Sequence, residues 1–469
     1  MQNKKIFILL PDGVGLRNFA YTNFYNLGKS SGYDITFWNI SAFDLEKLGL
    51  RQIKISDARL HPKTDILKKA RSIIELRWSA KRADDKVYYT YQHRLSYKNS
   101  KETLKSLAVK WLTFRFGSQS GLKSIRKSLQ QQERKTKYYH DCLETLKAEQ
   151  PVLVLCTNQR TTMALAPIAA ARDLGIPTVT FIFSWDNLPK ANKVIEADYY
   201  FVWSNHMKSE LLHYYPYVSE NRVMVTGTPQ FECHFNPSLI APRKDFFNTY
   251  GLDPDKRYIC YSGDDITTSP DDPAYLSDIA DAIRELNNKG YNLGIIFRRC
   301  PVDFSTRFDD VLERNKDIIT SIAPKWERIG AGWNTVLSTK EDMILQVNTI
   351  FHTEMVINLG SSMVFDYAAH GKPCCFINYD IPNSKFPNWS AQMVYDYIHF
   401  RSMPDNNAVI WLNSRDEIAK KLETVLSGNT DVVSHAQKWF EKINMHPPQD
   451  ASSRILEAID SIISQKHQL

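Results

Sequence analysis

Short apolar runs recur along this chain, and each ends in a loop rich in Gly, Ser, Asp or Asn and is followed by a helical segment. The first run is Ile6–Leu10, which ends in Pro11-Asp12-Gly13. Comparable runs follow at Val152–Cys156, Thr178–Phe183, Leu293–Phe297 and Met355–Asn358. Parallel strands need a crossover of a dozen or more residues, usually a helix, which covers a face of the sheet. The alternation therefore predicts α/β domains built on parallel sheets.

The 469 residues suggest two or three domains rather than one. The βα rhythm restarts at Tyr258–Gly263, after the stretch Phe235–Arg243, which contains two prolines and has no clear periodicity. We therefore predict an N-terminal domain over 1–237 and a C-terminal domain over 238–469. Three breaker-poor amphipathic stretches, which we expect to be closing helices of the second domain, end the chain: Arg415–Leu426, Asp431–Lys442 and Ala451–Gln465.

Residues 51–140 form a strongly basic segment of the predicted N-terminal domain. They carry 23 Lys and Arg against 7 Asp and Glu, whereas the whole chain has a net charge of +7. We expect a helical insertion here, with helices over Thr64–Ala80 and Lys101–Phe116. Charge runs are commonly solvated faces, but aromatic residues among the lysines, such as Trp111 and Phe114, also suit an anionic membrane surface. Nucleic acid is the competing partner; since no binding motif accompanies the charge, we expect none.

The N-terminal apolar run is too short for a signal peptide, and no window approaches the length of a membrane span. The seven cysteines include no C-x-x-C pair and fall largely in apolar runs, which is typical of free thiols in a reducing compartment. We therefore expect a cytoplasmic protein that can lie peripherally on the inner face of the cell membrane.

The stretch 355–373 carries the clearest chemical signal. An apolar strand runs into Gly360-Ser361-Ser362, and a helix follows at once. The serines can cap this helix, and its free N–H groups suit a diphosphate. Asp366, one turn into the helix, can accept hydrogen bonds from ribose hydroxyls. The alternative is a capped turn with no ligand.

Two groups of motifs resemble known bacterial enzymes. Residues 361–373, SSMVFDYAAHGKP, followed by a strand and Tyr379-Asp380, resemble the donor region of GT-B transferases of surface polymers, and most of all the CDP-glycerol glycerophosphotransferases. Ser184-Trp185-Asp186-Asn187, followed by Tyr199–Trp203 and Val223–Phe231, is similar to glycosyltransferases of surface carbohydrate synthesis. The matched stretches cover roughly 150–235 and 350–380, and the first 150 residues match only the general opening of the fold.

The resemblance implies two Rossmann-like domains facing a central cleft, with the nucleotide donor on the C-terminal domain and the acceptor on the N-terminal one. The residues that it places at the donor are Gly263, Asp264, Arg298, Arg299, Gly360, Ser361, Ser362 and Asp366. Among them, Arg298 and Arg299 follow a strand, where guanidinium groups can neutralise a leaving diphosphate. Their alternative is a surface pair at a strand end.

An inverting transfer needs a base for the acceptor hydroxyl, and two aspartates at strand ends are candidates. Asp12 lies in a loop with Gly13 and Gly15, which let a substrate approach the backbone, and Arg17 follows. Asp186 lies between Trp185, which could stack on a sugar ring, and Asn187, which could bond its hydroxyls. Each aspartate is alternatively a turn former or helix cap. A Glu pair eight residues apart, common in retaining enzymes, is absent, which favours inversion.

We expect no metal and no cofactor, with arginine and the helix dipole serving the donor phosphates. The predicted function is transfer of a sugar from a nucleotide-activated donor to a hydroxyl of a glycan or lipid-linked acceptor in cell-surface polysaccharide synthesis. The alternatives are a CDP-polyol phosphotransferase, a nucleotide-sugar 2-epimerase, and a non-catalytic membrane-associated subunit of a polysaccharide assembly complex.

Overall fold

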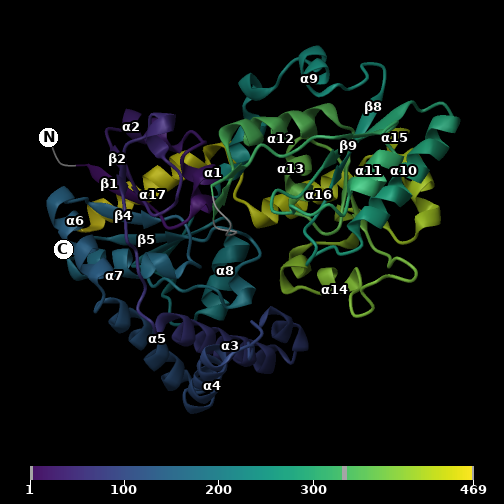
Figure 1. Cartoon of the computed structure of the whole chain (residues 1–469). Coiled ribbons are helices and arrows are strands. Elements are labelled where there is room, and N and C mark those ends of the chain that lie inside the picture. The colour runs from purple at the N-terminus through teal and green to yellow at the C-terminus, as the bar shows by residue number, and fades with distance from the viewer. Residues whose placement is uncertain (1–3, 330–334, 467–469) are drawn as a thin grey trace. The chain divides into compact units, whose positions relative to one another are not determined.

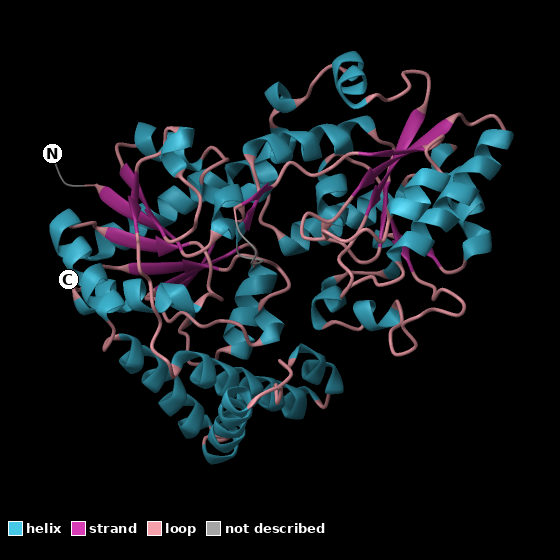
Figure 2. Ribbon diagram, viewed as in Figure 1, coloured by secondary structure: helices cyan, strands magenta, loops and turns pink. Residues whose placement is uncertain are grey.

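The computed structural model describes residues 4–329 and 335–466, which divide into two compact units (Figure 1). Unit 1 comprises residues 1–229 and 444–469, and unit 2 comprises 230–443. Each unit contains a mostly buried parallel sheet flanked by helices (Figure 2). The predicted α/β class with two parallel-sheet domains is therefore confirmed.

Unit 1 contains a seven-stranded sheet in the order β3-β2-β1-β4-β5-β6-β7. Its strands are β1 (Lys5–Leu10), β2 (Asp34–Asn39), β3 (Gln52–Lys54), β4 (Leu153–Cys156), β5 (Thr178–Phe181), β6 (Tyr199–Val202) and β7 (Val223–Val225). Its helices are α1 (Leu16–Phe19), α2 (Phe24–Ser30), α3 (Thr64–Ala83), α4 (Ser100–Arg115), α5 (Gln119–Glu133), α6 (Lys137–Glu149), α7 (Leu165–Asp173), α8 (Asn205–Tyr214) and α17 (Ala451–Lys466).

Unit 2 contains a six-stranded sheet in the order β10-β9-β8-β13-β14-β15. Its strands are β8 (Arg257–Ser262), β9 (Leu293–Arg298), β10 (Ile319–Ser321), β13 (Val356–Asn358), β14 (Cys374–Ile377) and β15 (Ile410–Leu412), and a two-stranded ribbon joins β11 (Glu327–Arg328) to β12 (Val336–Leu337). Its helices are α9 (Arg243–Tyr250), α10 (Asp272–Asn288), α11 (Asp309–Arg314), α12 (Lys340–His352), α13 (Met363–Ala369), α14 (Gln392–Tyr395), α15 (Ile418–Leu426) and α16 (Asp431–Ile443).

The chain is divided differently from the predicted boundary at residue 237. Unit 1 ends at Pro229, and residues 444–469 return to it instead of closing unit 2. The reason is that α17 buries its apolar side against unit 1, where it packs on α2 and Asp460 accepts a hydrogen bond from Tyr33. The linker Phe235–Arg243 accordingly lies inside unit 2.

The crossover from β1 to β2 contains two short helices, α1 and α2, and not one continuous helix. The hydroxyl of Thr22 donates to the carbonyl of Asn18 (2.6 Å) and accepts from the N–H of Phe24 (3.5 Å). A side chain thus replaces backbone partners at this point and interrupts the helix.

The basic segment is helical, as predicted, and its helices contribute to the core. Buried residues of α3, α5 and α6, and Val109 of α4, pack in one hydrophobic cluster with β1 and α7. Buried Arg71 of α3 donates to the carbonyls of Lys193 and Ala191, and Glu75 lies beside it. The segment is therefore an integral part of unit 1.

Candidate functional site

The candidate site of unit 2 lies where the direction of winding of its sheet reverses. β8 has β9 on one side and β13 on the other, so the chain builds outward through β10 and then returns to build outward through β15. Open parallel sheets bind ligands outside the carboxyl ends of their strands at such a reversal. Gly263 follows β8 and Gly360 follows β13 at this edge.

Charged side chains hydrogen-bond to the backbone of the loop after β8. The backbone N–H of Asp264 donates to Asp272 (2.7 Å), and its carbonyl accepts from Arg307. A Cβ at Gly263 would lie 2.9 Å from the ring of Phe297, so the loop packs closely on β9. Burial, together with the nearby carboxylates of Asp272 and Asp265, raises the pKa of Asp264 well above its ordinary value.

Arg298 ends β9 next to this loop, since its carbonyl accepts from the N–H of Gly263 (2.9 Å). The arginine is 7% exposed, and its Nη2 donates to Asp342 of α12 (2.7 Å). Asp342 also accepts from the indole of Trp326 (2.7 Å). Within the described residues, Nη1 of Arg298 has no hydrogen-bond partner. A buried guanidinium normally satisfies its donors, so Nη1 is an unusual buried donor that has no partner among the described residues.

Neighbouring Arg299 differs, since it is partly exposed, donates to the carbonyl of Ser305 and lies near Asp309.

The loop after β13 requires a glycine. Gly360 has a φ of +70°, and a Cβ there would lie 3.0 Å from both Phe400 and Val394. The N–H of Ser361 donates to Asn358 (2.9 Å), and its hydroxyl accepts weakly from Met363 N–H (3.4 Å). Ser362 precedes α13 without a side-chain cap bond among the described residues. Its hydroxyl is therefore not committed to the helix end that it was expected to cap.

Asp366 is buried in a line of three side chains. Its Oδ1 lies 2.8 Å from Nε2 of His234, whose Nδ1 lies 3.1 Å from Nε2 of His370. Burial and the neighbouring His234 lower the pKa of His370 to about 4, so its ring is neutral at neutral pH. His234 lies 132 residues from Asp366 and no sequence pattern marks it. The predicted ribose contact of Asp366 stays a prediction.

Unit 2 also contains a cavity of about 500 Å³. Tyr395 and Phe400, which a Cβ at Gly360 would approach, also line it, together with Trp411. Asn378 and Asn413, which follow β14 and β15, place it at the carboxyl edge of the sheet. Aromatic rings and amides are suited to a heterocyclic base.

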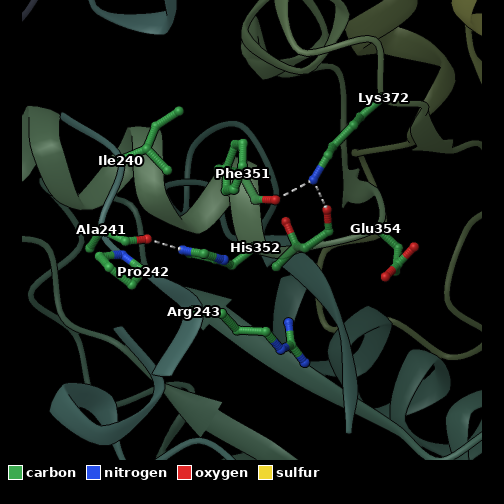
Figure 3. A pocket seen from close by; sticks show the side chains of 9 residues that line it. Ile240, Ala241, Pro242, Arg243, Phe351, His352, Glu354 and Lys372 are labelled. Atoms are coloured by element: carbon green, nitrogen blue, oxygen red, sulfur yellow. Dashed lines mark hydrogen bonds between the residues drawn. The ribbon is translucent and has the colours of Figure 1, made fainter. Parts of the chain in front are cut away.

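A second cavity in unit 2, of about 480 Å³, lies at the opposite edge of the sheet (Figure 3). Its Lys372 donates to the carbonyls of Ile350 and Phe351 at the end of α12, and to that of Thr353. Nε2–H of His352 donates to the carbonyl of Ala241 (2.9 Å). Burial lowers the pKa of Lys372 to about 8. These polar groups serve the backbone, which makes this cavity a weaker candidate.

In unit 1 the winding reverses between β1 and β4, and Asp12 lies there. Its Oδ1 accepts from the N–H of Val14 (3.1 Å), and its Oδ2 accepts from Nδ2 of Asn158 (2.8 Å), which follows β4. Burial raises the pKa of Asp12, while the Val14 N–H, Arg160 and Asn158 oppose the rise. Asn158, which sequence reasoning missed, is itself held because its Oδ1 accepts from the N–H of Arg160 (3.0 Å).

The two glycines of this loop are buried and one of them packs closely on the segment after β4. Gly13 and Gly15 are buried, and a Cβ at Gly15 would lie 2.3 Å from the hydroxyl of Thr157. Arg17 is half-buried in α1. Gly15 therefore lets the first helical turn approach β4.

The motif Ser184–Asn187 lies after β5 and is engaged within unit 1. Trp185 is 6% exposed. Asp186 is paired with Lys190 and accepts from Nδ2 of Asn187 (2.8 Å), whose Oδ1 accepts from Gln159 (2.8 Å). Of the two predicted bases, Asp186 is thus the one already neutralised by a lysine, and its role and those of its neighbours stay predictions.

No protein-family profile matches the sequence, and no curated protein matches it. Solved structures do match its fold. A Listeria monocytogenes protein assigned as a UDP-N-acetylglucosamine 2-epimerase has a TM-score of 0.57 at 12% identity, over 99% of this chain and 98% of that one. S. aureus MnaA in complex with UDP has a TM-score of 0.53 at 12% identity, over 98% of this chain and 97% of MnaA. A glycosyltransferase from Rickettsia africae has a TM-score of 0.52 at 11% identity, over 99% of both chains.

At these identities the likeness shows the fold alone. It confirms the predicted pair of Rossmann-like α/β domains. The resemblance to CDP-glycerol glycerophosphotransferases stays a prediction.

Proposed function

We propose that this chain is a glycosyltransferase that binds a nucleotide-activated sugar through unit 2 and transfers the sugar to a hydroxyl of a glycan or lipid-linked acceptor held by unit 1. The observation that carries the proposal is the reversal of winding in unit 2. Two glycine loops lie there beside a nine-tenths buried arginine whose Nη1 has no partner among the described residues. S. aureus MnaA, a protein of the same fold, has been solved in complex with UDP.

Each residue at this edge has a role that suits a nucleoside diphosphate. Arg298 would donate Nη1 to a phosphate oxygen and oppose the charge that develops on the leaving diphosphate. Gly263 and Gly360 would let the phosphates approach the backbone. The cavity lined by Tyr395 and Trp411 would hold the base.

Asp12 of unit 1 is the base that the contacts favour. It would take the proton of the acceptor hydroxyl as the acceptor oxygen bonds to the anomeric carbon and the bond from that carbon to the diphosphate breaks. Its two hydrogen bonds, from Val14 N–H and Asn158, fix the carboxylate, and burial raises its pKa. No group of three or more metal-ligating side chains is found in the described residues.

We expect one nucleoside diphosphate to raise the Tm of the full chain by several degrees in a thermal-shift screen of UDP, GDP, CDP, CMP and TDP. At 100-fold excess over Kd, a ligand of the native state stabilises it by about 2.7 kcal/mol. UDP, GDP or TDP would support sugar transfer, and selective stabilisation by CDP or CMP would favour a polyol-phosphate or CMP-sugar substrate. No shift with any of them would contradict the donor site.

A 2-epimerase is the second candidate, because the Listeria monocytogenes protein of the same fold is assigned as a UDP-N-acetylglucosamine 2-epimerase. The two functions differ in their products. A transferase releases nucleoside diphosphate in proportion to acceptor, whereas an epimerase changes the sugar of the nucleotide with no acceptor present.

A further inference from the structure

Helix α4 presents four of its large apolar side chains outward, contrary to the usual surface helix. The side that faces the protein carries Ser106, Val109 and Thr113, which are 1–5% exposed. The outer residues are Leu104 (68% exposed), Leu107 (52%), Trp111 (60%) and Phe114 (89%). We call these four residues the α4 stripe. Single exposed apolar residues are ordinary, but four on one helix need a partner.

The four residues form one continuous band. Their spacing is three, four and three, so they lie on the same face of the helix. Trp111 packs edge-on against Phe116, with ring centroids 6.4 Å apart.

Basic side chains border the stripe. Lys101, Lys110 and Arg115 of α4 are exposed, and Lys123 and Lys127 of α5 are exposed nearby in the chain. Glu102, the single acidic residue of α4, bonds to the hydroxyl of Ser96. The surface therefore combines apolar bulk with positive charge.

The helix that carries the α4 stripe is fixed to the rest of unit 1. α4 packs against α3, whose residues belong to the core of unit 1, and it is the outermost of these helices in Figure 1. The indole N–H of Trp78 in α3 donates to the carbonyl of Gly117 just after α4 (2.8 Å). The stripe is thus presented by a fixed helix.

We propose that α4 docks unit 1 onto an anionic lipid surface, with the stripe in the interfacial region and the bordering bases against the headgroups. Binding of this kind combines buried apolar area with attraction to anionic lipid. A second copy of the chain is a poor occupant, because a two-fold contact would oppose two basic segments, each with 23 basic and 7 acidic residues. No helix in the described part of the chain could span a membrane, and the docking does not depend on the nucleotide.

The test is co-sedimentation of the full chain with phosphatidylcholine vesicles containing about one third phosphatidylglycerol. We expect binding to these and not to pure phosphatidylcholine vesicles. L107Q/W111Q/F114Q should lower the partition coefficient by roughly 100-fold or more. K101Q/K110Q/R115Q should lower it by about fivefold per charge. The matched control K244Q/K316Q/K420Q removes three exposed lysines of unit 2 and should bind as wild type.

Quenching of Trp111 by brominated lipid gives a second readout that does not depend on loss of binding. Trp111→Phe should keep vesicle binding and lose most of the quenching. Wild-type failure to bind anionic vesicles, or equal binding by the stripe variant, would overturn the proposal. So would a dimer in solution that the stripe variant dissociates without any vesicle binding by wild type.

Discussion

Asp12→Asn is expected to lower kcat by roughly 10²–10⁴-fold while the nucleotide affinity of unit 2 is unchanged. The substitution removes the proton acceptor and keeps the size of the side chain. Stability should change by about 1 kcal/mol or less, because a buried charge is removed while one of the hydrogen bonds from Val14 and Asn158 is lost. Steady-state kinetics and the Tm of the same preparation check both parts.

The pH dependence of kcat/KM is a second test of Asp12 as the base. Burial raises the pKa of Asp12, so the folded enzyme takes up its proton at a higher pH than an exposed aspartate does. The base works only when ionised, so kcat/KM should fall as the pH falls through this raised pKa. The acid limb should therefore lie above the ordinary aspartate range and vanish in Asp12→Asn.

Asp186→Asn is the matched comparison, because Asp186 is the other predicted base and is paired with Lys190. We expect Asp186→Asn to lower kcat less than Asp12→Asn does. If Asp186→Asn abolished turnover and Asp12→Asn did not, the roles would be reversed. If a variant carrying both Asp12→Asn and Asp186→Asn kept the cellular function of the protein, a non-catalytic subunit would be the better description.

Arg298→Met is expected to weaken nucleotide binding by roughly 10–100-fold and to destabilise unit 2 by about 3 kcal/mol. The first effect follows from loss of the Nη1 donor. The second follows because Asp342 would remain buried with its hydrogen bonds from Trp326 and Lys325 but without its counter-charge.

A double variant separates the two effects. Arg298→Met with Asp342→Asn removes the stranded charge, so its Tm should recover towards wild type while its nucleotide affinity stays low. Arg299→Met removes the neighbouring, partly exposed guanidinium and should change both quantities little. Recovery of affinity together with stability in the double variant would show that Arg298 serves the fold and not the ligand.

The sheets were predictable because buried strands are runs of four to six apolar residues, such as Ile6–Leu10. β3, β10 and β15 were not predicted, because three-residue strands at or near the sheet edges are too short to show a periodicity. The return of α17 to unit 1 was missed for a different reason. An amphipathic helix shows that it has an apolar face, but not which core that face covers.

The candidate site was predictable only in its loops. Gly263 and Gly360 follow apolar runs, and their places at one edge follow from parallel strands. The residues that hydrogen-bond to the candidate site residues are distant from them in sequence and belong to no recognisable motif. Asn158 is 146 residues from Asp12, His234 is 132 residues from Asp366, and Asp342 is 44 residues from Arg298.

The most direct test of donor binding at the carboxyl edge of the unit 2 sheet is a calorimetric titration of two variants, Gly360→Ala and Gly371→Ala. The ligand is the nucleotide that most stabilises the wild-type protein. The two glycines flank α13 and have φ values of +70° and +65°, so alanine costs about 1–2 kcal/mol of backbone strain at each. Only Gly360 lies at the proposed site, where its Cβ would also press on Phe400. Donor binding at this edge predicts a Kd at least about tenfold weaker for Gly360→Ala and a wild-type Kd for Gly371→Ala. Equal affinities in the two variants would contradict it.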